Sequence, residues 1–184
     1  MMKKVLLLLH PGVEEIEAVT SIDLLRRAGI EVLAASVTSD LEVTGGRGIA
    51  LKADALLSEV STQIFDMLVI PGGPGVDALR KRPEVLELIR RFYREDRLIA
   101  AICAAPLVLL DAGIAAGHTL TSFPDAEKEF QSKVKAYVSG RVVQDGKLVT
   151  SRGAGTAEEF SLALIEILAG PKAAEQVRER IVAR

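Results

Sequence analysis

The segment LIAAICAAP, residues 98–106, decides the fold of this chain. Residues 98–102 form a short apolar run typical of a buried strand, and the small residues and Pro106 after Cys103 are typical of a turn into a helix. Small residues on either side of a strand-to-helix junction meet the steric requirement of a nucleophile elbow, whose central side chain projects above a parallel sheet. The segment therefore predicts an α/β fold with Cys103 at one edge of its sheet.

Short apolar runs alternate with amphipathic helical stretches on both sides of this segment. This alternation is the pattern of parallel strands covered by helices on both faces. We therefore predict one domain over residues 1–184 with a three-layer α/β/α architecture. The predicted strands are residues 5–9, 30–37, 67–70, 98–102 and 119–122, the predicted helices are residues 14–27, 83–94, 105–111 and 156–168 with a charged helix from Pro171, and the predicted hairpins lie within residues 41–53 and 138–150.

Two further expectations concern packing. In the first helix, Ile16, Val19 and Leu24 are predicted to form the apolar stripe that faces the core. Pro124 opens a polar segment that we expect to be mobile.

Composition excludes several classes of function. The chain has 23 basic and 25 acidic residues, five Phe, two Tyr and no Trp, so neither nucleic acid nor an anionic membrane is an expected partner. The longest uncharged apolar run, residues 98–110, is shorter than the ~20 residues of a membrane-spanning helix. The apolar start of the chain lacks a small-residue cleavage site, so we expect a cytoplasmic protein.

Cys103 is the only cysteine, which excludes an intramolecular disulfide and a thiolate metal cluster. At the start of a helix the thiolate form is expected to be favoured, and the amides of Ala104 and Gly73 are candidates to hold an oxyanion. The alternative is a buried structural cysteine, because cysteine also behaves as a small hydrophobic residue.

Glu17 is the candidate acid beside the thiol. Glu14 and Glu15 are explained by their favourable interaction with the helix dipole, whereas Glu17 borders the buried stripe near the strand ends. A carboxyl group there is expected to be desolvated and protonated, so that it can donate a hydrogen bond to a thiolate or an oxidised sulfur.

The remaining polar candidates have weaker patterns. His10 follows the first strand and either borders the site or has no role, while His118 is expected at the surface at the opposite end. The two histidines lack metal-ligand spacing, so no zinc site is predicted. Residues 153–155 read Gly-Ala-Gly, but Glu158 would repel a pyrophosphate, so dinucleotide binding is disfavoured and Arg152 is expected to anchor loops or a carboxylate.

Four motifs in order resemble the ThiJ/PfpI superfamily, and most closely its deglycase subfamily associated with Parkinson disease, with its bacterial relatives. These motifs are GVEEIE at residues 12–17, Pro-Gly-Gly at 71–73, AICAAP at 101–106 and TSRGAGT at 150–156. The resemblance extends from residue 5 to about residue 177.

The resemblance implies a flavodoxin-like sandwich, a homodimer, and a site that needs no cofactor or metal. It assigns the reactive cysteine to Cys103, the glutamate hydrogen-bonded to it to Glu17 and the backbone donors to Gly73 and Ala104. Arg47 corresponds to an arginine that approaches the site across the dimer interface. The implied activities are conversion of methylglyoxal to lactate, removal of early glycation adducts, and oxidative-stress sensing with chaperone-like protection.

Three departures refine this expectation. Phe123 stands where the human-like proteins have a histidine, and Ala104 stands where the peptidase branch has one, so peptidase activity is disfavoured. No histidine follows His118, so the His–Glu pair of glutamine amidotransferases is absent. We therefore expect a slow cysteine-dependent deglycase or glyoxalase acting on small α-oxoaldehydes, with a redox-sensing stress protein as the alternative.

Overall fold

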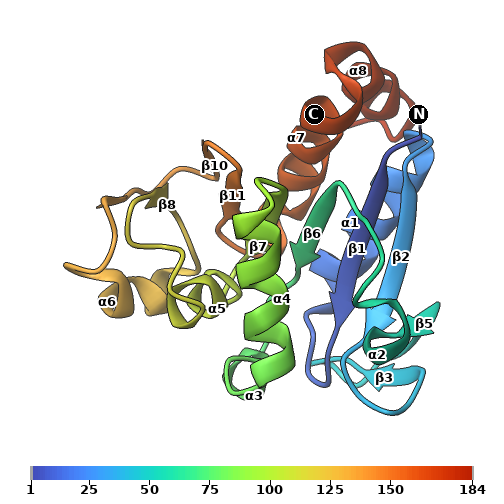
Figure 1. Cartoon of the computed structure of the whole chain (residues 1–184). Coiled ribbons are helices and arrows are strands. Elements are labelled where there is room, and N and C mark those ends of the chain that lie inside the picture. Colours follow the sequence, from blue (N-terminus) through green and yellow to red (C-terminus); the bar gives the residue numbers. More distant parts are fainter. Residues whose placement is uncertain (1, 184) are drawn as a thin grey trace.

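A computed structural model describes residues 2–183 and places a seven-stranded sheet at the centre of the molecule (Figure 1). The strands of this sheet are β1 (Lys4–Leu9), β2 (Glu31–Ser36), β5 (Ala55–Leu56), β6 (Met67–Ile70), β7 (Leu98–Ile102), β10 (Val142–Asp145) and β11 (Leu148–Ser151). Their spatial order is β10-β11-β7-β6-β1-β2-β5, and every neighbouring pair is parallel except β10 with β11. The predicted mostly parallel sheet is confirmed.

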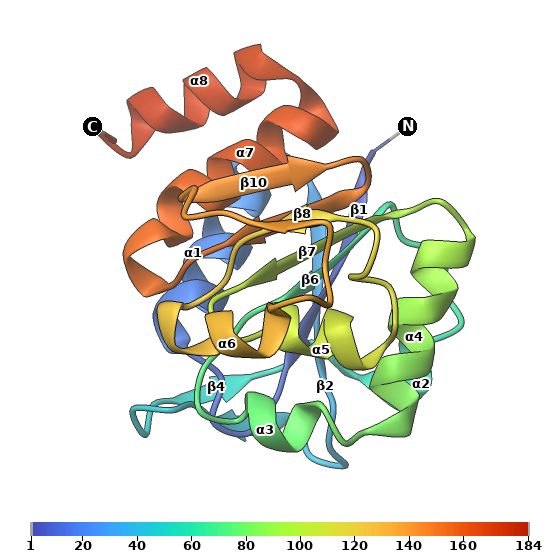
Figure 2. The same cartoon turned by 90° about the vertical axis from the view of Figure 1, so that its left-hand side faces the viewer.

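Helices cover both faces of the sheet (Figures 1 and 2). One face carries α1 (Glu15–Arg27) and α7 (Ala157–Ala169), with α8 (Pro171–Arg180) packed on α7. The other face carries α2 (Leu57–Val60), α3 (Val76–Leu79), α4 (Pro83–Arg94), α5 (Pro106–Asp111) and α6 (Glu127–Phe130). The three-layer prediction is therefore confirmed. None of the helices within residues 2–183 is long and apolar enough to cross a membrane.

The alternation of side chains along β1 builds two hydrophobic cores. Leu6 and Leu8 pack with Ile89 of α4 on one face, while Leu7 packs with Phe160 of α7 on the other. Side chains of successive strand residues point to opposite faces, so a strand buried on both sides is continuously apolar. This explains the uninterrupted run at residues 5–9.

The predicted apolar stripe of α1 is wrong for two of its three members. Ile16 is 54% exposed and Val19 is 47% exposed, whereas Ser21 and Leu25 are buried with Leu24. Small side chains set the buried face because α1 packs closely on α7. The hydroxyl of Ser161 on α7 donates to that of Ser21 at 3.2 Å.

Two small sheets lie outside the central one. The predicted hairpin within residues 41–53 forms β3 (Glu42–Thr44) and β4 (Ala50–Lys52), which are antiparallel. The predicted strand 119–122 is shorter, β8 (Thr119–Leu120), and pairs with β9 (Ala136–Tyr137) instead of joining the main sheet. The segment from Pro124 is a short 3₁₀ turn (Pro124–Ala126) followed by α6, and it buries Phe130 in the core, so the expectation of a mobile segment is wrong.

Candidate active site

Cys103 is the first residue of the three-residue turn between β7 and α5, and its backbone has φ = +66°. This left-handed conformation is unfavourable for a residue with a Cβ and persists only where surrounding contacts enforce it. Its N–H donates to the Ser151 carbonyl at 3.0 Å, and its carbonyl accepts from the Phe123 N–H at 2.8 Å. The predicted elbow is therefore present and is held from two neighbouring segments.

The loop after β6 fits against this elbow only because it contains glycines. A Cβ built on Gly72 would lie 2.6 Å from the Cβ of Cys103. Gly73 has φ = +107°, and a Cβ there would lie 2.4 Å from the Gly12 carbonyl oxygen. The backbone of this loop can therefore approach both the thiol and the loop after β1.

Glu17 in the first turns of α1 is completely buried beside Cys103. Its Oε2 accepts a 2.7 Å hydrogen bond from the Gly72 N–H. Its Oε1 is buried with no conventional hydrogen-bond partner among residues 2–183, and the adjacent Cys103 thiol interacts with the carboxyl. Burial raises the pKa of Glu17 to about 7, against the opposing effect of the Gly72 amide and the thiol.

The expectation that the helix start favours the thiolate is wrong. Burial, and then the negative charge of Glu17, raise the pKa of Cys103 to about 12. The Ala104 and Gly73 amides interact with the sulfur and oppose this rise, but they are outweighed. The physical reason is that the sulfur lies in a desolvated site beside the Glu17 carboxylate.

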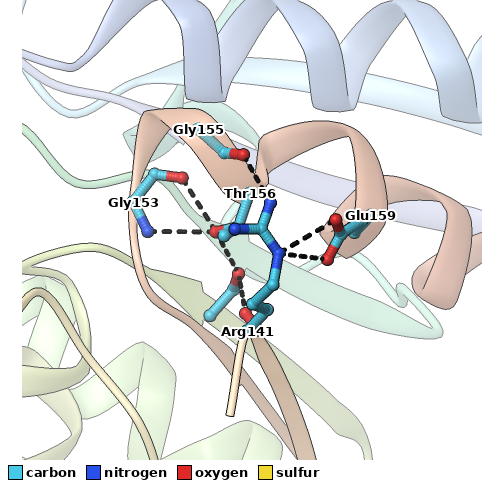
Figure 3. A network of polar contacts seen from close by, with 6 residues as sticks. Arg141, Gly153, Gly155, Thr156 and Glu159 are labelled. Atoms are coloured by element: carbon cyan, nitrogen blue, oxygen red, sulfur yellow. Dashed lines mark hydrogen bonds and ion pairs between the residues drawn. The ribbon is translucent and has the colours of Figure 1, made fainter. Parts of the chain in front are cut away.

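Loop 151–156 supports the elbow from the β11 side through buried hydroxyl groups (Figure 3). The Thr156 Oγ1 donates to the Gly153 carbonyl at 2.9 Å, accepts from the Gly153 N–H at 3.1 Å, and lies 2.7 Å from the Ser151 Oγ. The Ser151 carbonyl in turn accepts from Cys103. These hydroxyls therefore fix the backbone that holds Cys103.

Arg141 closes this loop from outside (Figure 3). Its Nε donates to Glu159 Oε2 at 2.8 Å, and its Nη2 donates to the Gly155 carbonyl at 2.8 Å. Its own carbonyl accepts from the Ser151 hydroxyl at 2.6 Å. The arginine thus joins the segment before β10 to the start of α7.

Residues 3–167 match the DJ-1/PfpI family. The chain belongs to this family. It is 39% identical over 183 residues to Protein dj-1beta of Drosophila melanogaster, covering 99% of this chain and 98% of the relative. It is also 37% identical over 171 residues to the Glutathione-independent glyoxalase DJR-1.2 of Caenorhabditis elegans, covering 92% and 91%. The resemblance to the ThiJ/PfpI superfamily is confirmed.

Solved structures of the DJ-1/PfpI family share the whole architecture. The crystal structure of Drosophila melanogaster DJ-1beta has a TM-score of 0.97 at 39% identity and covers 100% of both chains. The structure named "Toxoplasma gondii DJ-1, oxidized" has a TM-score of 0.93 at 36% identity and covers 98% of both chains. The fold predicted from the alternating pattern is thus that of the family.

Phe123 and Arg152 lie beside the elbow of this DJ-1/PfpI protein. The Phe123 side chain is 42% exposed, and its ring lies 3.4 Å from where a Cβ on Gly153 would be. Arg152 follows Ser151 directly, and its Nη1 is buried with no hydrogen-bond partner among the described residues. The predicted anchoring contact of Arg152 to a loop is therefore not seen at this nitrogen, which leaves the carboxylate alternative as a prediction.

The two histidines occupy different edges of the sheet. His10 is buried between the Pro11 and Pro71 carbonyls, each 3.2 Å from a ring nitrogen, and burial lowers its pKa. It therefore joins the first two site loops. His118 lies at the opposite edge as predicted, where it is partly exposed and Tyr93 packs against its ring.

Arg47 lies in the turn between β3 and β4 with its side chain exposed, 3.9 Å from a Glu14 carboxylate oxygen. Its N–H donates at 2.7 Å to Glu15, which is buried and fastens this turn to α1. The assignment of Glu15 to the helix dipole therefore missed a structural role. Gly45 was the available signal, since a Cβ there would lie 2.3 Å from Glu15 Oε1.

The sequence patterns also missed Gly72, Ser151 and Thr156 as supports of the elbow. Each lies within a quoted motif. The partners of Gly72 and Ser151 are distant in sequence, and the contacts of Thr156 depend on the rotamer of its side chain. Within residues 2–183 no group of three or more His, Cys, Asp or Glu side chains is arranged to hold a metal ion.

Proposed function

We propose that this protein is a Cys103-dependent enzyme that converts small α-oxoaldehydes such as methylglyoxal to α-hydroxy acids and acts on their early adducts with proteins and nucleotides. The observation that carries the proposal is the buried Glu17 carboxyl beside the Cys103 sulfur, at an elbow to which the Gly73 and Ala104 amides are directed. The glyoxalase named among the family relatives supports it.

The site supplies the groups for each step with methylglyoxal. The Glu17 carboxylate takes the thiol proton while the sulfur bonds to the aldehyde carbon, and the amides hold the resulting oxyanion. Glu17 then returns this proton to the oxyanion and is again a carboxylate. It takes the C–H proton of the hemithioacetal and delivers it to the neighbouring carbon, while the hydroxyl proton passes to the ketone oxygen, so that the hemithioacetal becomes a lactoyl thioester of Cys103. Water then cleaves the thioester, releasing lactate and restoring the thiol. Glu17 is the only side-chain base found to interact with the sulfur among residues 2–183. Because this one group must carry every proton, we expect slow turnover.

The test is lactate formation from methylglyoxal by the purified protein and by Cys103→Ser. We expect the variant to lose about 10²-fold or more of the rate, since the nucleophile is removed. In the wild type the rate should rise as the pH rises through about 7, where Glu17 ionises and becomes a base. Equal rates for the two proteins would show that Cys103 has no catalytic role.

A second candidate function is redox sensing through Cys103. The same amides, together with Glu17 in its protonated form, provide donors that fit a sulfinate, and a family structure is named as oxidized. Two equivalents of peroxide convert the thiol to a sulfinic acid, with one water released at each step. Glu17 both receives the thiol proton and returns a hydrogen bond to the product.

Intact-mass analysis after mild peroxide tests this candidate. The wild type should gain two oxygens on the Cys103 peptide, Cys103→Ser should gain none, and Glu17→Leu should proceed to three because the donor is lost. An unmodified thiol, or identical products with and without Glu17, would contradict it.

A further inference from the structure

Three side chains from separate elements meet at the sheet edge opposite Cys103. The Tyr93 hydroxyl at the end of α4 lies 3.1 Å from His118 Nε2. The His118 Nδ1 lies 3.8 Å from Asp145 Oδ1 at the end of β10. A hydroxyl, an imidazole and a carboxylate thus lie next to one another, with the carboxylate just beyond hydrogen-bond distance of the imidazole, and the Cys103 site uses none of them.

The surroundings fix which nitrogen of His118 carries the proton. Nδ1 is buried without a hydrogen-bond partner in the part of the chain that the structure describes, and the Asp145 carboxylate is the acceptor nearest to it in the ion pair. Asp145 is itself anchored, because its Oδ2 accepts from the Thr119 N–H at 2.7 Å. A proton on Nδ1 is favoured beside this negative charge, which leaves Nε2 free to accept the Tyr93 proton.

We propose that Tyr93 is a second reactive site, a nucleophilic hydroxyl that takes acyl groups from small activated acyl donors, with His118 as its base and Asp145 as the group that orients the imidazole. The phenol oxygen bonds to the acyl carbon, the donor's leaving group departs, and the phenol proton passes to His118 Nε2 and then to the leaving group. Base and carboxylate lie in the order that activates a hydroxyl in hydrolytic triads.

The Tyr93 hydroxyl is also accessible to an acyl donor. Tyr93 is 41% exposed, and its ring meets that of His118 edge to face at 5.8 Å between centroids, so one side of the hydroxyl is held while the other faces solvent. Tyr137, the other tyrosine, is partly buried and donates to the Ser122 carbonyl at 3.2 Å, with no imidazole in contact. The chain therefore contains its own unactivated tyrosine for comparison.

N-acetylimidazole is a suitable probe, because it transfers an acetyl group to tyrosine oxygen and releases imidazole. Peptide mass analysis before and after hydroxylamine, which removes O-acetyl but not N-acetyl groups, gives the rate at each tyrosine. We expect Tyr93 to react about tenfold faster than the free model compound N-acetyltyrosine amide, although the folded chain partly covers it. A Tyr93 rate below that of the model compound would overturn the proposal.

Two variants separate activation from packing. His118→Phe keeps a ring against Tyr93 but removes the base, and Asp145→Asn keeps an acceptor for the Thr119 N–H but removes the charge. Both should lower the Tyr93 rate about tenfold while leaving Tyr137 unchanged.

Lys135 also interacts with Asp145. Lys135→Gln keeps both His118 and Asp145 and should therefore leave the Tyr93 rate near that of the wild type. Unchanged Tyr93 rates in both His118→Phe and Asp145→Asn would show that His118 only packs against Tyr93.

Discussion

Glu17 and Cys103 share a buried environment, and the position of one proton between the carboxyl and the thiol decides whether the sulfur is nucleophilic. The pKa of Glu17 is raised to about 7 and that of Cys103 to about 12, so between these values the pair holds its single negative charge on the carboxylate. A nucleophilic sulfur then forms only as its proton moves to Glu17. Attack and deprotonation are therefore coupled, and Glu17 is the group on which the pH dependence should rest.

The raised pKa of Glu17 also predicts how stability changes with pH. The folded state binds the Glu17 proton more tightly than the unfolded chain, so stability falls as pH rises from about 4.5 to about 7. Glu17→Gln cannot ionise but can still accept from Gly72. Urea unfolding at pH 4.5 and pH 8 should show Gln gaining about 3 kcal/mol relative to the wild type across this range.

Glu42→Gln is the matched control for this measurement, because Glu42 is an exposed carboxyl on β3. It should follow the wild-type pH dependence. Parallel curves for Glu17→Gln and the wild type would show that the carboxyl is not desolvated in the folded state.

Gly72 should not tolerate a side chain, since the new Cβ would meet the Cβ of Cys103 at 2.6 Å. Gly72→Ala is expected to cost about 1–3 kcal/mol and to abolish Cys103-dependent turnover by displacing the thiol. Gly117→Ala is the control, because no atom lies within 4 Å of its added Cβ. Thermal unfolding and lactate formation would check both, and full activity in Gly72→Ala would refute the close approach.

At the scale of elements, the position of Cys103 depends on two loops that are far from it in sequence. The loop after β6 supplies glycines, and the loop after β11 supplies the Ser151 carbonyl that accepts from Cys103. Parallel strands bring their carboxyl ends to one edge of the sheet, which is why these loops meet. The elbow is therefore a property of three adjacent strand ends.

Thr156 tests the contribution of the loop after β11. Thr156→Val keeps the side-chain shape but leaves the Gly153 N–H and the Ser151 hydroxyl without this partner, which should cost about 1–3 kcal/mol. Thr156→Ser retains the hydroxyl and should stay near wild type. Urea unfolding measures the stability of each variant, and methylglyoxal turnover reports whether Cys103 keeps its position. A Val variant as stable and active as the Ser variant would exclude this support.

At the scale of the whole molecule, exposed apolar side chains lie on α1 and on the turn beside it. Ile16 and Val19 on α1 are exposed, and Ile49 in the adjacent turn is 55% exposed. The turn is fastened to α1 because the Ile49 N–H lies 3.4 Å from Glu15 Oε1. Neighbouring exposed apolar side chains are typical of an interface between proteins. We expect this surface to form the predicted homodimer, which would carry Arg47 toward the partner's site.

Val19→Arg should therefore convert a dimer to a monomer at micromolar concentration, because a charge would be buried without a partner. Ile64→Arg is the control, since Ile64 is 74% exposed and lies in the loop between α2 and β6. Light scattering measures the mass of each. A monomeric wild type, or a Val19→Arg protein that remains dimeric, would rule out this interface.

Local sequence determined the elements and the elbow. The apolar runs at 5–9, 67–70 and 98–102 became strands, because a strand buried on both faces needs continuous apolar side chains. Small residues around Cys103 allowed its turn, and this requirement is also local. Glu17 and Cys103 can therefore be recognised as candidates from the sequence alone.

Only tertiary structure decided the environment of those candidates. The pKa of the thiol depends on burial and on a carboxylate that is distant in sequence, so the local helix start predicted the wrong direction. The buried face of α1 likewise depended on its close packing against α7, which left Ile16 and Val19 outside. Backbone propensity acts over a few neighbouring residues, whereas desolvation, charge and packing are set by whichever residues the fold brings together.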